Sequence, residues 1–77
     1  MTHHDEFNQH VREMTCGGDV GRRKFLKMWL NTVFHMPQHL DMVNNVKQKL
    51  YVHWSQEDKD LTDFIMGEVI EALALDD

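Results

Sequence analysis

The sequence of 77 residues predicts an all-α protein, a small bundle of three or four helices. Apolar residues recur at steps of three and four along almost the whole chain, which is the period of an amphipathic helix. No segment sustains the alternation of polar and apolar residues that is typical of a strand. Glycine, proline and serine stand between the periodic segments, where helices are expected to end. We expect a single helical domain over residues 1–77.

The first predicted helix covers about residues 4–15. Acidic residues at its start suit the positive end of a helix dipole. The glycine pair Gly17 and Gly18 ends it, because glycine readily adopts the left-handed conformation that follows many helices. The residues at helical spacing are Phe7, His10, Val11 and Met14.

The second predicted helix, over about residues 19–36, has the clearest periodicity. We expect Asp19 to be its N-cap, because a carboxylate there accepts hydrogen bonds from amides of the first turn. Pro37 disfavours helical geometry at Met36 and therefore ends or kinks the segment. The apolar stripe consists of Leu26, Trp29, Leu30, Val33 and Phe34.

Two further helices are predicted over about residues 38–54 and 57–74. Ser55, with Asp58 three residues later, resembles a capping box and predicts the start of the last helix. The expected core positions of the third helix are Leu40, Val43, Val46, Leu50 and Trp54. Those of the fourth helix are Leu61, Phe64, Ile65, Val69, Ala72 and Leu73.

Charge is segregated along the chain, although the formal net charge is only -5. Residues 1–19 carry four acidic residues and one basic residue, a net charge of -3. Residues 20–54 carry six basic residues and one acidic residue, a net charge of +5. Residues 55–77 carry eight acidic residues and one basic residue, a net charge of -7. Such segregation concerns association with partners, including other copies of the chain, rather than the fold.

The composition argues against several classes of protein. No apolar run approaches the roughly 20 residues of a membrane-spanning helix, so we expect no membrane association. The single cysteine, Cys16, cannot form an internal disulfide, which argues against a disulfide-stapled secreted scaffold and favours a cytoplasmic protein. So small a core leaves little room for an active-site cleft, and the sequence has no recognisable catalytic or phosphate-binding motif. We expect neither an enzyme nor a cofactor.

The leading hypothesis is a non-enzymatic module for protein–protein interaction, a small acidic regulator or inhibitor that occludes or bridges a partner protein. Small acidic proteins of phages and mobile elements often act in this way. We expect the contact on the second helix, with Phe25 and Met28 exposed, because aromatic residues, methionine and arginine are common interface anchors. Charge would steer the encounter, and a homo-oligomer would bury the same surface. The predicted partner-binding residues are Arg22, Arg23, Lys24, Phe25, Lys27, Met28 and Trp29.

Two alternatives remain open. The basic first half of the second helix favours a nucleic-acid-binding regulator, because cations on phosphates dominate such affinity. The acidic overall balance, however, is unusual for that class. A metal-binding protein is the other alternative, because His35 and His39 have the i, i+4 spacing of two ligands on one helix face. Pro37 lies between them, and no metal site is assigned.

Overall fold

The computed structural model describes the backbone of residues 3–75 and the side chains of residues 8–74. Its elements are α1 (His3–Cys16), α2 (Gly18–His35), the 3-10 turn η1 (Pro37–His39), α3 (Leu40–Tyr51) and α4 (Gln56–Leu75). The all-α prediction is confirmed, since residues 3–75 contain no strand. The side chain of Phe7, which we expect on the first apolar stripe, lies outside the described side chains.

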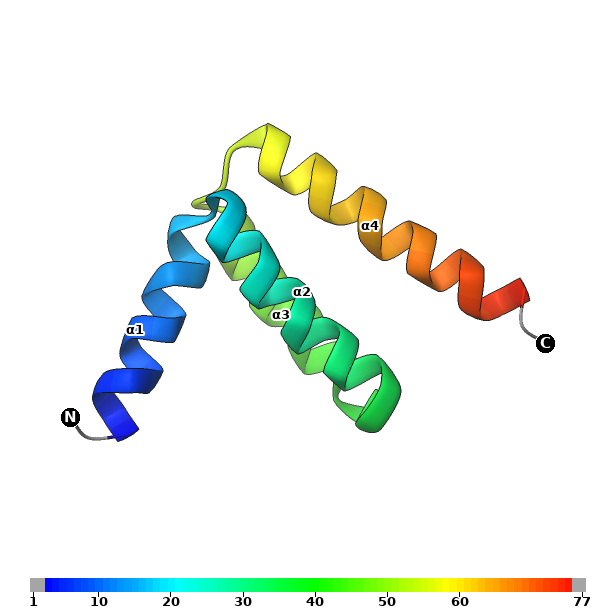
Figure 1. The fold of residues 1–77 in the computed structure, drawn as a ribbon, viewed down its shortest axis with the longest axis horizontal. Helices are drawn as coiled ribbons and strands as arrows, with labels where there is room; N and C mark the ends of the chain where they lie inside the picture. The colour runs from blue at the N-terminus through cyan, green and yellow to red at the C-terminus, as the bar shows by residue number, and fades with distance from the viewer. Residues whose placement is uncertain (1–2, 76–77) are drawn as a thin grey trace.

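The helices α2 and α3 form an antiparallel hairpin, and the other two helices lie on different sides of it (Figure 1). The helix α1 packs against α2 and touches α3, whereas α4 packs chiefly against α2. From the end of the hairpin near residues 52–55, α4 diverges toward the C-terminus (Figure 1). The molecule is therefore elongated, with extents of 45 × 28 × 18 Å.

The core forms where all four helices meet. Phe25 and Trp29 of α2 are at its centre. The ring of Trp54 stands edge-on to Phe25, with 6.1 Å between ring centroids and planes at 89°. This is a favoured arrangement of aromatic rings, because the positive edge of one meets the negative face of the other. The remaining buried apolar side chains are Met14, Val43, Leu50 and Met66.

Pro37 separates two helices rather than kinking one. The helix α2 ends at His35, and Met36 takes an extended φ of -141°. That conformation is expected before a proline, whose ring clashes with a helical predecessor. Pro37 then opens η1, which turns the chain into α3.

The C-terminal end of the third predicted helix also differs from the structure, because α3 stops at Tyr51. The amides of His53 and Trp54 donate to carbonyls three residues back, at 2.9 and 3.3 Å. Such bonds tighten the last turn of a helix. The β-branched Val52 at this point has a lower helix propensity. Trp54 therefore reaches the core from residues 52–55, the link between α3 and α4, rather than from a helix.

Candidate protein interface

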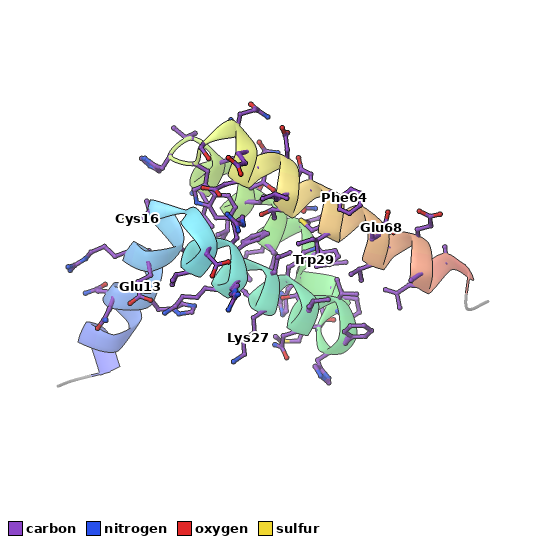
Figure 2. All side chains as sticks on the ribbon, turned by 45° about the horizontal axis from the view of Figure 1, so that its top comes forward. Glu13, Cys16, Lys27, Trp29, Phe64 and Glu68 are labelled. Carbon is purple, nitrogen blue, oxygen red and sulfur yellow. The ribbon has the colours of Figure 1, made fainter. Side chains whose placement is uncertain are left out.

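The basic residues predicted to bind a partner lie in the first half of α2, and three of them bind carboxylates. The ion pairs are Arg22 with Asp58, Arg23 with Asp19, and Lys24 with Glu13. Arg22 thus ties α2 to α4, and Lys24 ties α2 to α1. The hydrogen bond from Lys24 holds the pKa of Glu13 below its usual value. Lys27 lies on the outer surface of α2 (Figure 2).

The apolar residues of the predicted interface are largely internal. Phe25 is fully buried against Trp54, so the expectation that it is exposed is wrong. Trp29 is also buried and lies in the middle of the molecule (Figure 2). Met28 is half-buried and packs against the core cluster. In this structure the predicted surface therefore offers Met28, Arg23 and Lys27 to a partner, whereas Phe25 and Trp29 hold the fold together.

Asp58 stabilises the turn at Gly17 that joins α1 to α2, which we call the elbow. The N-cap of α2 is Gly17, one of two glycines with positive φ, and it has no side chain with which to cap the helix. The carboxylate of Asp58 replaces it, accepting a hydrogen bond of 2.9 Å from the Gly18 amide. This bond and the Arg22 guanidinium hold the pKa of Asp58 below its usual value. The predicted N-cap, Asp19, lies inside the first turn.

Trp54 also stabilises the elbow, through a hydrogen bond to α1. Its indole Nε1–H donates to the carbonyl oxygen of Met14 at 2.7 Å, near the end of α1. A Cβ atom at Gly17 would lie only 3.0 Å from Cδ1 of Trp54. Glycine is thus required at residue 17 both by its φ of 72° and by the ring beside it. The carboxylate of Asp58 and the indole N–H of Trp54 therefore both have hydrogen-bond partners within the fold.

The helix α4 is poorly covered by its neighbours. Among its described side chains, only Thr62 and Met66 are buried. Leu61, Phe64 and Ile65 share one side of the helix at i, i+3 and i+4, and they are 41%, 66% and 40% exposed. We call this side the outer face of α4. Figure 2 shows Phe64 and Glu68 on the edge of α4 that faces away from Trp29.

The sequence predicts these three residues in the core, and that prediction is wrong. Among the described helices, α2 alone makes substantial contact with α4, so one side of α4 has no neighbouring helix in the described chain. A signal was nevertheless present, because apolar residues occur on nearly every side of the predicted fourth helix. A helix of that kind needs more cover than one neighbouring helix provides.

Acidic residues surround the outer face. Asp60 and Glu68 lie one turn before and one turn after Phe64, and Glu57 lies one turn before Leu61. All three are exposed. The outer face is therefore an apolar strip bordered by carboxylates.

The opposite side of α4 borders a groove, which lies between this helix and the α2–α3 hairpin and has a volume near 430 Å³. Its lining includes Trp29, Val33, Leu40, Lys47, Met66 and Ile70. Nearby, the Tyr51 hydroxyl donates to Asp63 at 2.8 Å, and burial together with this bond raises the pKa of Tyr51 above its usual range.

Among the described residues, no three His, Cys, Asp or Glu side chains lie close enough together to hold a metal ion. No helix within residues 3–75 is long and apolar enough to cross a membrane. Cys16 is a free, exposed thiol at the end of α1.

The chain matches no protein-family model, no curated protein and no solved structure. The fold and the candidate interface together define a class, a small all-α protein with one helix left partly uncovered.

Proposed function

We propose that this protein is a non-enzymatic protein–protein interaction module, a regulator or inhibitor that occludes or bridges a partner protein in the cytoplasm. The observation that carries the proposal is the exposed apolar outer face of α4, formed by Leu61, Phe64 and Ile65. Large apolar side chains that cluster on a surface commonly mark sites of protein contact.

The charge around the outer face defines the chemistry of the partner. Carboxylates of Glu57, Asp60 and Glu68 border the apolar strip. A complementary surface has an apolar groove flanked by lysine and arginine, including a groove that otherwise holds nucleic acid. Opposite charges at the rim speed the encounter, and the apolar centre supplies the affinity.

This proposal moves the main contact from α2 to α4. The basic side chains Arg22, Arg23 and Lys24 have carboxylate partners, and Phe25 and Trp29 are buried. These facts weigh against the nucleic-acid alternative as well, because the same three cations would have to exchange a carboxylate for a phosphate.

The test compares proteins captured from a lysate by the wild-type chain and by two variants, with nuclease and moderate salt throughout. Phe64→Glu places a charge in the outer face, whereas Val52→Glu places the same charge at an 80% exposed position in the link. Both positions are exposed, so neither variant should melt appreciably lower than the wild type. We expect a protein that is retained by the wild type and by Val52→Glu to be lost with Phe64→Glu.

Two outcomes contradict the proposal. One is a set of captured proteins that Phe64→Glu leaves unchanged. The other is material that disappears with nuclease and returns without it, which would make nucleic acid the partner and assign the contact to basic residues such as Arg23 and Lys27.

A further inference from the structure

The groove between α4 and the hairpin has an apolar floor that the rest of the described chain leaves open. Trp29 and Val33 line it from α2, Leu40 from the start of α3, and Met66 and Ile70 from α4. Ile70 is 56% exposed. The groove lies on the other side of α4 from Leu61 and Ile65, so it is a second exposed apolar surface.

Gly67 lies in the middle of α4 and lines this groove. Within the described chain, a Cβ atom at this position would meet no other element and no side chain within 4 Å. A glycine inside a helix weakens it relative to alanine, and here the chain's own packing gives no reason for it. A close approach by another molecule does give a reason, because glycine lets a second backbone come near.

In Figure 1 the C-terminal half of α4 diverges from the α2–α3 hairpin. Val69 is half-buried, whereas Ile70 and Leu73 are exposed. Helical segments gain most of their stability from packing, and one that is apolar on several sides needs cover on those sides. The C-terminal half of α4 therefore requires a neighbour.

The accessible surface is larger than that of a compact monomer of the same mass. The chain exposes 5750 Å². A compact monomer of 9.2 kDa would expose about 4,900 Å². The excess of about 850 Å² is comparable with the area that each partner buries in an interface of standard size, so the chain has enough surplus surface for such a contact. The radius of gyration of 13.2 Å also exceeds the value of about 11.5 Å for a compact chain of this length.

We infer that two copies of this chain pair about a twofold axis near Gly67, with the C-terminal half of each α4 in the groove of the other. Gly67, Ile70, Glu71 and Ala74 share one side of α4 at i, i+3, i+4 and i+7. The small residues permit close contact of the two helices, and Ile70 fills the partner's groove. Because the same surface is used twice, the assembly closes as a dimer and does not extend into a filament.

The segregation of charge along the chain points to a second copy as the occupant. The groove is lined by one cation, Lys47, and one anion, Asp63. The Lys47 ammonium lies 5.4 Å from the centre of the Tyr51 ring, and the Asp63 carboxylate accepts the hydrogen bond of the Tyr51 hydroxyl. The C-terminal half of α4 carries Glu71 beside Ile70 on the paired side. In the dimer, Glu71 of each copy meets Lys47 of the other. The segregation of acidic residues into the last third of the chain and basic residues into the middle third fits this exchange.

The first test adds bulk at the axis. Sedimentation equilibrium of the full chain over a range of concentrations should give the mass of two chains for the wild type. Gly67→Leu should raise the dimer dissociation constant by about tenfold or more, because overpacking a close contact is strongly unfavourable. Its melting temperature at low concentration should not fall, because the added side chain enters open space in the single copy.

Ala72→Leu is the matched control, since it adds bulk on the same helix but on the side away from the groove. It should dimerise as the wild type does. The inference is overturned by a chain that is monomeric at every concentration, by a Gly67→Leu variant that dimerises normally, or by a mass that keeps rising beyond two chains.

A charge exchange tests the orientation. Lys47→Glu alone and Glu71→Lys alone should each raise the dissociation constant by about tenfold, because each places like charges together. The double variant should recover most of the lost affinity. If both single variants leave the affinity unchanged, the two helices do not meet as inferred.

This inference and the proposed function can fail separately, because Leu61 and Ile65 of the outer face lie on the side of α4 away from Gly67 and Ile70. Ile65→Glu should leave the dimer intact, and Gly67→Leu should leave the exposure of Leu61 and Ile65 unaltered. Loss of dimerisation with Ile65→Glu alone would assign self-association to the outer face and overturn the groove contact.

Discussion

The side chain of Asp58 joins the starts of two helices through hydrogen bonds. Its side chain is only 14% exposed, and it accepts hydrogen bonds from the Gly18 amide and from Arg22. Meanwhile its own amide donates to Ser55 Oγ at 3.2 Å, which is one half of the predicted capping box. The other half is missing because the carboxylate caps α2 instead of its own helix. One side chain thus joins the start of α2 to the start of α4.

We expect Asp58→Asn to lower the midpoint of urea unfolding at neutral pH. The neutral amide has no charge for Arg22 and only one acceptor oxygen, whereas the carboxylate accepts from Gly18 and Arg22 with different oxygens. The folded-state pKa of Asp58 is depressed below its ordinary value of 3.8. Its stabilisation is therefore present above that ordinary value and is lost as the pH falls through the lower, folded-state pKa. The difference between wild type and variant should shrink below about pH 4.

Glu57→Gln is the control for this measurement. It removes the same charge from the same turn of α4, but at an exposed position. A surface substitution of this kind changes stability by about 0.5 kcal/mol at most. An equal effect of the two variants, or a difference that persists unchanged at low pH, would contradict the role given to Asp58.

At the scale of the elements, two helical glycines show what each helix touches. A Cβ atom at Gly21 of α2 would lie 2.8 Å from the carbonyl oxygen of Glu13 and 3.1 Å from that of Met14. The backbones of α1 and α2 therefore approach each other closely at this point, and glycine makes the approach possible. Around Gly67 of α4, in contrast, the described chain leaves open space.

The same substitution should consequently have opposite effects in the two helices. Gly21→Ala should destabilise the fold by about 1–3 kcal/mol, because backbone atoms of α1 have to move. Gly67→Ala should stabilise the single copy by about 0.5–1 kcal/mol, because alanine is the better helix former. Chemical denaturation at a concentration where the chain is monomeric measures both. Two changes of the same sign would mean that one of these helix environments is misassigned.

The sequence predicts where the helices begin and end better than it predicts which helices pack against each other. Periodicity and the glycine pair place the first two helices within one residue of the observed ends, since both signals are local. Local signals do not reveal that Phe25 faces Trp54, or that Asp58 reaches Gly18, because these contacts join residues far apart in the sequence. The prediction that Phe25 is exposed on the second helix is wrong for the same reason. Which apolar side of α4 is covered depends on helices that lie elsewhere in the chain.

At the scale of the whole molecule, six histidines and a net charge of -5 define its behaviour near neutrality. As the pH falls from 8 toward the isoelectric point of about 5.6, the net charge approaches zero and the repulsion between copies weakens. We expect the lowest solubility near that pH. A solubility curve measured from pH 8 to pH 5 tests this, and a flat curve would contradict it.

The elbow between α1 and α2 has a consequence for the order in which the molecule is assembled. The two side-chain contacts that lock it, from Trp54 to Met14 and from Asp58 to Gly18, each span 40 residues. On a growing chain, the first two helices emerge long before the residues that fix the angle between them. Closing so long a loop costs conformational entropy before any contact compensates for it. The N-terminal elbow is thus among the last features to become rigid, and a nascent chain that stops before residue 54 lacks both locks.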